Sequence, residues 1–270
     1  MDNVKVNGMI IREIDLGDTD KLITVLTDTM GKITVSCKGV RSIKSKRLAS
    51  SQLFCYGELL LSVRAGKYYL ADATVENSFF ELNSSLEKLS LAQYFCQVAN
   101  AVTVENEDQS EILSLLLNCV YVLCNNKRPH ELVKAVFEMR LCALLGFCPD
   151  LSACAGCSCE PKDGKGVFYL HVSEGCMFCA DCILDENGKL PKELSSSNTK
   201  IFPLTYSMLN TLRYITGAPA KKIFSFTLTN SDNNSNDPTR TLGEITEGFL
   251  LYYLDRSFET LDFYHSIQGL

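Results

Sequence analysis

Residues 5–37 read KVNGMIIREIDLGDTDKLITVLTDTMGKITVSC. Apolar and polar side chains alternate in three segments of this stretch: 5–13, 22–27 and 32–37. Alternation with a period of two residues is typical of β-strands that bury one face. Leu16-Gly17-Asp18 and Met30-Gly31-Lys32 supply turn residues between the segments. The stretch therefore predicts three consecutive strands joined by turns.

Two more strands are predicted downstream, over 52–64 and 68–75, with the tight turn Ala65-Gly66-Lys67 between them. The first 80 residues thus hold five short antiparallel strands. Five strands of this length favour a small closed barrel, and the five-stranded OB-fold is the leading candidate.

Beyond the barrel, apolar side chains recur with helical spacing over longer segments: 82–104, 110–124, 131–145, 206–215 and 240–254. Asp108 or Ser110 is a suitable start for the second of these helices, and Pro129 for the third. The sequence predicts an α+β protein, with an OB-fold domain over 1–80 and an α-helical domain over 81–270.

Four cysteines form two pairs, Cys154-Ala-Gly-Cys157 and Cys179-Ala-Asp-Cys182, separated by 21 residues. Both sulfurs of a pair can face one ion, and two pairs complete a tetrahedron of thiolates around Zn²⁺. Four protein ligands leave no open coordination position, so such a site is structural. The pattern predicts one Zn²⁺ per chain, in a module inserted into the helical domain at about 152–184.

The exact ligand set stays open at this stage, because Cys159, Cys176 and His171 lie next to the pairs. Either extra cysteine can replace a ligand, and spacing alone also admits an iron–sulfur cluster. His171 is a weaker spare ligand, because it lies in an alternating segment and is expected to be an exposed strand residue. The alternative for the pairs is a set of buried free thiols, as expected for the lone cysteines in apolar stretches: Cys55, Cys96, Cys119 and Cys142.

Thirteen cysteines in 270 residues, without a secretory signal at the N-terminus, favour a reducing compartment over a disulfide framework. No apolar run approaches the roughly 18 residues that a membrane span needs. We expect a cytoplasmic protein that is not associated with a membrane.

Charge is unevenly distributed. The net charge is −6, yet residues 1–80 carry 11 Lys/Arg against 9 Asp/Glu, whereas 81–270 carry 15 against 23. No acidic residue lies between Asp28 and Glu58. A local basic patch can bind phosphates on an acidic protein, because screening limits distant charges to about 8–10 Å. We predict that five residues of this segment contact DNA phosphates: Lys38, Arg41, Lys44, Lys46 and Arg47.

The alternative for this basic segment is a solvated loop that only keeps the protein soluble. Its place on a predicted OB barrel favours DNA binding, because that fold commonly binds single strands. Four nearby aromatic residues offer stacking surfaces, although strand aromatics are more often core: Phe54, Tyr56, Tyr68 and Tyr69.

The chain resembles the bacterial RecO family of recombination mediators. The segments that carry the resemblance follow the family's order along nearly the whole chain: 14–22 (IDLGDTDKL), 27–32 (TDTMGK), 38–41 (KGVR), 137–141 (FEMRL), 144–151 (LLGFCPDL), 154–157 (CAGC) and 174–182 (EGCMFCADC). The family commonly has Gly-Gly before the second cysteine pair, where this chain has Gly175-Cys176. The family pattern favours Cys179 and Cys182 as ligands.

The resemblance implies an OB-fold barrel, a helical domain and a zinc module within it. It also implies binding of single- and double-stranded DNA and annealing of complementary strands. The implied partners are RecR, with which the family helps to load RecA onto coated DNA, and the C-terminal tail of the single-stranded DNA-binding protein that forms the coat. No catalysis and no cofactor beyond zinc are implied.

A tail that is acidic and ends in an apolar residue needs a hydrophobic pocket with a positively charged side chain at its edge, which accepts the terminal carboxylate. Val133, Phe137 and Leu141 are apolar at helical spacing, and Arg140 lies beside them. We predict that Phe137, Arg140 and Leu141 bind this tail, with plain core residues and a surface charge as the alternative.

Other functional classes fit less well. The sequence contains no P-loop, no dinucleotide-binding glycine motif after a strand and no H-E-x-x-H metalloprotease motif. A metal-dependent nuclease needs a cluster of carboxylates, which Asp15, Asp18 and Asp20 offer. Their place at a predicted turn instead favours a role in forming the turn. A zinc-ribbon adaptor in transcription or translation shares the barrel and the metal. Annealing of complementary oligonucleotides distinguishes a mediator from both.

Overall fold

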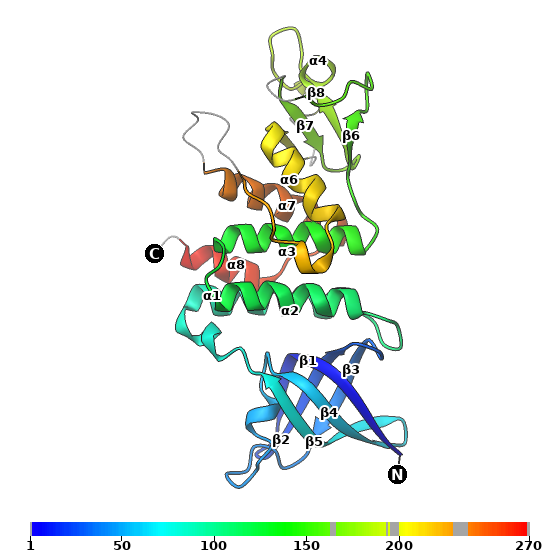
Figure 1. Ribbon diagram of the computed structural model, residues 1–270, viewed down its shortest axis with the longest axis vertical. Helices are drawn as coiled ribbons and strands as arrows, with labels where there is room; N and C mark the ends of the chain where they lie inside the picture. Colours follow the sequence, from blue (N-terminus) through cyan, green and yellow to red (C-terminus); the bar gives the residue numbers. More distant parts are fainter. Residues whose placement is uncertain (1, 163–165, 193, 195–199, 229–236, 269–270) are drawn as a thin grey trace. The chain divides into compact units, whose positions relative to one another are not determined.

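The structure, a computed structural model, describes residues 2–162, 166–192, 194, 200–228 and 237–268 (Figure 1). The chain divides into two compact units, one formed by Met1–Lys127 with Phe258–Leu270 and the other by Arg128–Ser257. In the described part of the chain, no helix combines the length and the apolar character needed to cross a membrane.

The first unit begins with a closed barrel of five strands: β1 (Asp2–Leu16), β2 (Asp20–Thr27), β3 (Lys32–Cys37), β4 (Tyr56–Arg64) and β5 (Lys67–Asn77). Neighbours follow the order β1-β2-β3-β5-β4, and β4 pairs with β1 to close the barrel. All pairs are antiparallel except β3 with β5, where Val35 lies opposite Tyr68 and Ser36 opposite Tyr69. This barrel confirms the predicted OB-fold but corrects the expectation that all five strands are antiparallel, because β3 and β5 run parallel.

Alternation along the strands fills the barrel interior. Ile23, Val25, Val35 and Leu61 are fully buried, and Ile10 is 1% exposed. Burying one such side chain contributes about 1.5–3 kcal/mol. A one-residue shift of register would turn these side chains outward, so the apolar pattern fixes the register.

Helices complete the first unit: η2 (Phe80–Ser84), α1 (Leu86–Val102), α2 (Ser110–Cys124) and α8 (Glu259–Ile267). α2 spans the predicted 110–124, and Asp108 accepts a hydrogen bond from the amide of Ser110 at its start. Two hydrogen bonds from Lys32 join the barrel to α1 and to the segment that follows it. Lys32 Nζ donates to the carbonyl of Asn100 in α1 at 2.7 Å, and the Lys32 amide donates to the carbonyl of Val104 at 2.9 Å.

The second unit is built on α3 (His130–Leu144), α6 (Tyr206–Gly217) and α7 (Pro238–Leu254), with the short η3 (Ala220–Lys222) after α6. The predicted segments 131–145, 206–215 and 240–254 match these helices within two residues. Pro129 precedes α3 as expected, and α7 begins where Asp237 accepts a hydrogen bond from the amide of Thr239. α3 packs against both α6 and α7.

A small sheet inserted between α3 and α6 carries the paired cysteines: β6 (Asp150–Cys154), β7 (Phe168–His171), β8 (Cys176–Cys179) and β9 (Ile201–Leu204). The order is β6-β8-β7-β9, with β6 and β8 parallel and the other pairs antiparallel. The one-turn helix α4 (Ala180–Ile183) follows β8 directly. Because β6 and β8 are parallel neighbours, their C-terminal ends lie side by side.

Candidate metal centre and nucleic-acid surface

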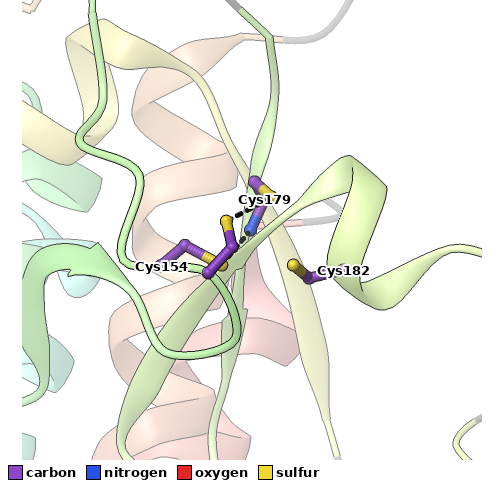
Figure 2. A group of neighbouring side chains, drawn as sticks. Cys154, Cys179 and Cys182 are labelled. Atoms are coloured by element: carbon purple, nitrogen blue, oxygen red, sulfur yellow. Dashed lines mark hydrogen bonds between the residues drawn. The ribbon is translucent and has the colours of Figure 1, made fainter.

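The structure brings Cys154, Cys157, Cys179 and Cys182 together, and their four sulfurs all lie within 4.8 Å of one another. Cys157 Sγ and Cys179 Sγ are 3.7 Å apart. In Figure 2 the side chains of Cys154, Cys179 and Cys182 converge, with Cys182 reaching the cluster from α4. Among the described residues, this is the only group of three or more His, Cys, Asp or Glu side chains close enough to hold an ion. The cluster can hold a metal ion.

Each cysteine pair starts at the end of a strand. Cys154 ends β6 and Cys179 ends β8, and the amide of Ala155 donates to the carbonyl of Met177 at 2.9 Å, which ties the two turns together. Gly156 lies where a Cβ atom would come within 3.0 Å of Cys182 Sγ. Glycine at this position therefore lets the first turn approach the fourth cysteine.

Backbone amides point at the sulfur of Cys154, as expected for a thiolate. Burial raises the pKa of Cys154, but amide hydrogen bonds from Cys179, Cys157 and Gly156 outweigh burial and lower the pKa to about 6. The amide of Cys179 donates to Cys154 Sγ at 3.2 Å. An amide hydrogen bond from Cys159 likewise lowers the pKa of Cys157. Thiolates are the form that binds metal.

The three spare ligands are placed differently. The carbonyl of Cys159 accepts a hydrogen bond from the amide of Cys154, which keeps Cys159 beside the cluster. Cys176 instead faces Glu174, with Cys176 Sγ 3.8 Å from a carboxylate oxygen. His171 Nε2 is buried and has no hydrogen-bond partner among the residues that the structure describes, and it lies 3.8 Å from a carboxylate oxygen of Glu174. None of the three belongs to the group of four sulfurs.

His171 corrects one expectation. It does lie on a strand, β7, but it is 5% exposed and not a surface residue. Its ring packs edge-on against Phe178, with centroids 6.1 Å apart. Alternation of apolar and polar residues along a strand predicts one buried and one exposed face, but both faces of β7 are covered at His171.

The basic loop, defined here as residues 38–47, is held to the barrel at both ends. Arg41 donates to the carbonyl of Gly17 at 2.8 Å and pairs with Asp15 at 3.1 Å. Arg47 donates to the carbonyls of Leu70, at 2.6 Å, and Lys38, at 3.3 Å. Both guanidinium groups thus have structural contacts that sequence could not reveal.

The three lysines of the basic loop present their side chains to solvent. Lys38, Lys44 and Lys46 are exposed, and Ile43 between them is fully exposed. The loop therefore presents cations to solvent on an anchored backbone. Such an arrangement can bind phosphates with little loss of chain entropy.

The acidic residues before this loop help to position it. Asp15 pairs with Arg41, and Asp20 accepts a hydrogen bond from the amide of Gly39 at 2.8 Å. That amide bond is the largest cause of the lowered pKa of Asp20. Asp18 is exposed at the turn. Asp15 and Asp20 therefore anchor the loop, a role that sequence reasoning missed.

The residues predicted to bind a peptide tail lie on α3. Phe137, Leu141 and Val133 are fully buried, so they present no surface, and burial favours the alternative of core residues. Arg140 is partly buried and donates a hydrogen bond to the carbonyl of Thr216 in α6.

Comparison with known families accounts for nearly the whole chain. The model of the family described as "Recombination protein O N terminal" matches residues 1–79, and "Recombination protein O C terminal" matches 83–262. The boundary between the two falls between the barrel and α1.

Curated relatives match over similar lengths. A protein of Acetivibrio thermocellus named DNA repair protein RecO is 29% identical over 270 residues, which is 100% of this chain and 99% of the relative. Proteins of the same name from Caldicellulosiruptor bescii and Clostridium acetobutylicum are 26% and 25% identical, and each match covers 98% of this chain and at least 98% of the relative.

Proposed function

Since the chain belongs to the recombination protein O (RecO) family, as its resemblance implied, we propose that it is a DNA repair and recombination mediator that binds single- and double-stranded DNA and anneals complementary strands. The observation that carries this proposal is the anchored basic loop with exposed Lys38, Lys44 and Lys46. Single strands and duplexes both present phosphates, so one loop can bind both kinds of DNA. Residues 1–80 are then the DNA-binding domain.

Annealing follows from the same contacts. Two complementary strands repel each other through their phosphates, and cations that neutralise both strands at once lower that repulsion. Lysine suits this role because its ammonium group is a point charge without a required base geometry. The protein then acts by binding, not by catalysis, in the bacterial cytoplasm at the nucleoid.

The proposed partners are those that the resemblance to the family implies. We propose that the chain works with RecR to load RecA onto DNA coated by single-stranded DNA-binding protein. Loading of RecA onto such coated DNA, measured with and without RecR, tests this part of the proposal independently of DNA binding.

We propose Zn²⁺ as the metal of the cysteine cluster. A tetrahedron with Zn–S distances of about 2.3 Å has sulfur–sulfur edges of about 3.8 Å. The 3.7 Å between Cys157 Sγ and Cys179 Sγ agrees with such an edge. Four thiolates leave no position for water, so the ion would hold the small sheet together and would not activate a nucleophile.

Replacing Lys44 and Lys46 by alanine is expected to weaken DNA binding. Each lost phosphate contact should reduce the slope of log affinity against log salt by about 0.7 for single strands. The slope is measured by titrating labelled single-stranded DNA at four salt concentrations, and annealing of complementary oligonucleotides is followed in parallel. Arg41 and Arg47 are left unchanged because they anchor the loop.

The matched control is Lys189→Ala with Lys192→Ala, because these two lysines are also exposed but lie in the second unit. It removes the same charge and should leave the slope unchanged. If both double variants had the wild-type slope, the basic loop would be only a solvated surface.

The second unit is proposed to bind the acidic C-terminal tail of the single-stranded DNA-binding protein. Arg140 is the one candidate on α3 that is not fully buried. Arg140→Glu should lower the affinity for a labelled tail peptide by roughly tenfold, because it replaces attraction of the carboxylate by repulsion. Arg140→Lys keeps the charge and should bind more tightly than Arg140→Glu. Equal affinity of all three proteins would exclude Arg140, and no binding to wild type would exclude the partnership.

A further inference from the structure

An open pocket of about 430 Å³ lies on the outside of the barrel. Its lining comes from β2, β3, β5, the turn before β5, the start of the basic loop and the segment after α1, and includes Thr34, Ser36, Lys38, Lys67, Tyr68 and Tyr69. The pocket thus spans the place where β3 and β5 pair in parallel. Pockets that hold small organic groups measure about 300–1,000 Å³. The volume is sufficient for one nucleotide.

Tyr69 presents its ring at this pocket. Its neighbour Tyr68 packs against the barrel core, so alternation along β5 directs Tyr69 to the outer face. Lys38 Nζ lies 5.7 Å and the Arg64 guanidinium carbon 5.8 Å from the centroid of the Tyr69 ring. These distances are near the outer limit of about 6 Å for cation–π contacts. Both cations are exposed, so they can move from the ring to a phosphate when another group stacks there.

The turn before β5 holds two of the cations in place. Arg64 at the end of β4 lies opposite Lys67 at the start of β5, across the two-residue turn Ala65-Gly66. Both turn residues have positive φ, 49° and 72°, as a type I′ hairpin turn requires. The backbone positions of Arg64 and Lys67 are therefore fixed on either side of a tight hairpin end.

The chemistry of the pocket fits an unpaired base with its phosphate. An aromatic face offers stacking to any base, cations offer contacts to the backbone, and the hydroxyls of Thr34 and Ser36 offer hydrogen bonds. Glu105 is the acidic residue of the lining and disfavours a phosphate beside it. The phosphate would therefore lie toward Lys38 and Lys67.

We propose that this pocket binds one unpaired base of single-stranded DNA, stacked on Tyr69. The proposal rests on the proposed function and deepens it. The basic loop contacts phosphates, which single strands and duplexes share, whereas the pocket needs a base whose face is free. In a duplex both faces of each base are covered by its neighbours. Tyr69 would thus give the protein a preference for single strands.

The chain contains no tryptophan, so Tyr69→Trp introduces one fluorescent reporter into the pocket. Its fluorescence should be quenched by a single-stranded oligo-dT and not by a duplex of equal length. Tyr121→Trp is the matched control, because Tyr121 is 47% exposed and also has a cation, Lys127 Nζ, 4.3 Å from its ring centroid, but it does not line the pocket. Its fluorescence should not respond to either DNA.

Affinity gives the second measurement. Tyr69→Leu should lower the affinity for single-stranded DNA roughly 5- to 150-fold, the effect of losing one stacked base, and should change duplex affinity less than twofold. Tyr69→Phe keeps the stacking face and should bind like wild type. On wild type alone, an oligonucleotide with abasic sites should bind roughly 5- to 150-fold more weakly than the intact strand, a comparison that needs no variant.

The outcomes separate the two proposals. Equal loss for single strands and duplex in Tyr69→Leu, no loss for either, or equal quenching at positions 69 and 121 would overturn the pocket assignment. If the basic-loop variant also lost DNA affinity in those cases, the proposed function would stand without the pocket. If wild type bound no DNA, both would fall.

Discussion

Replacing Cys154 and Cys179 by serine should release the metal and unfold the small sheet of the second unit. These two cysteines are the least exposed of the four, at 2% and 9%, and one comes from each pair. Apparent binding free energies of structural Zn²⁺ in small zinc-finger peptides are about 10–16 kcal/mol at pH 7. The strands of the sheet have only four or five residues, so we expect the metal to supply much of its stability.

Elemental analysis of the purified protein should give one zinc per wild-type chain and none in this variant. Hydrogen exchange should become fast in β6 to β8, while the barrel strands keep their protection because their core is separate. The matched control is Cys159→Ser with Cys176→Ser, which removes two neighbouring thiols outside the group of four. Zinc retained by the first variant and lost by the control would assign the ligands to Cys159 or Cys176.

The barrel could be predicted from sequence because its signals are local. Period-two alternation marks each strand, and glycine-containing turns mark the ends, as at Gly17 and Gly31. The small sheet was not predicted as a sheet, because four-residue strands are too short for periodicity to separate from chance. Its strand order also depends on pairing between segments distant in sequence.

The candidate sites divide in the same way. The cysteine pairs were visible because C-x₂-C spacing is a local pattern, and the structure brings all four together. The anchoring role of Arg41 and Arg47 could not be predicted from sequence, because their partners lie 23 to 26 residues away: Asp15, Gly17 and Leu70. Charge composition locates a basic loop but cannot distinguish a cation that anchors it from one that faces solvent.

Helix α3 marks the limit of periodicity most clearly. Apolar residues at helical spacing indicate a buried face, but they do not say whether a groove or a neighbouring helix covers it. Here α3 contacts both α6 and α7, so Phe137 and Leu141 are enclosed. The same enclosure buries Lys134, which sequence analysis did not single out.

Replacing Lys134 by methionine should destabilise the second unit by about 3–5 kcal/mol, the usual effect of leaving buried charge without its partner. Lys134 is 1% exposed, and its Nζ lies 2.8 Å from Glu247, 3.6 Å from Glu138 and 3.7 Å from Glu131. It also donates to the carbonyl of Gly243 at 3.0 Å. Methionine fills similar space but leaves three carboxylates around an uncharged side chain. Urea unfolding at pH 7 measures the loss.

Two comparisons identify charge as the cause. Lys5→Met breaks the exposed pair with Glu58, whose side chains are 63% and 43% exposed, and should cost less than about 1 kcal/mol. Adding Glu138→Gln to Lys134→Met removes the most buried of the three carboxylates around Lys134 and should recover part of the loss. Equal stability of the single and double variants would mean that packing, not charge, sets the effect.

The pH dependence of the wild type follows from the same cluster. Burial lowers the pKa of Lys134, but Glu138, Glu247 and Glu131 outweigh burial, and the net shift is upward. A lysine whose folded pKa exceeds its unfolded value stabilises the fold fully below the unfolded pKa of about 10.4. That contribution is lost as the pH rises through the folded pKa. Wild type should therefore lose stability above about pH 10 more steeply than Lys134→Met, which has no proton to release at this position, and parallel profiles would place the titrating group elsewhere.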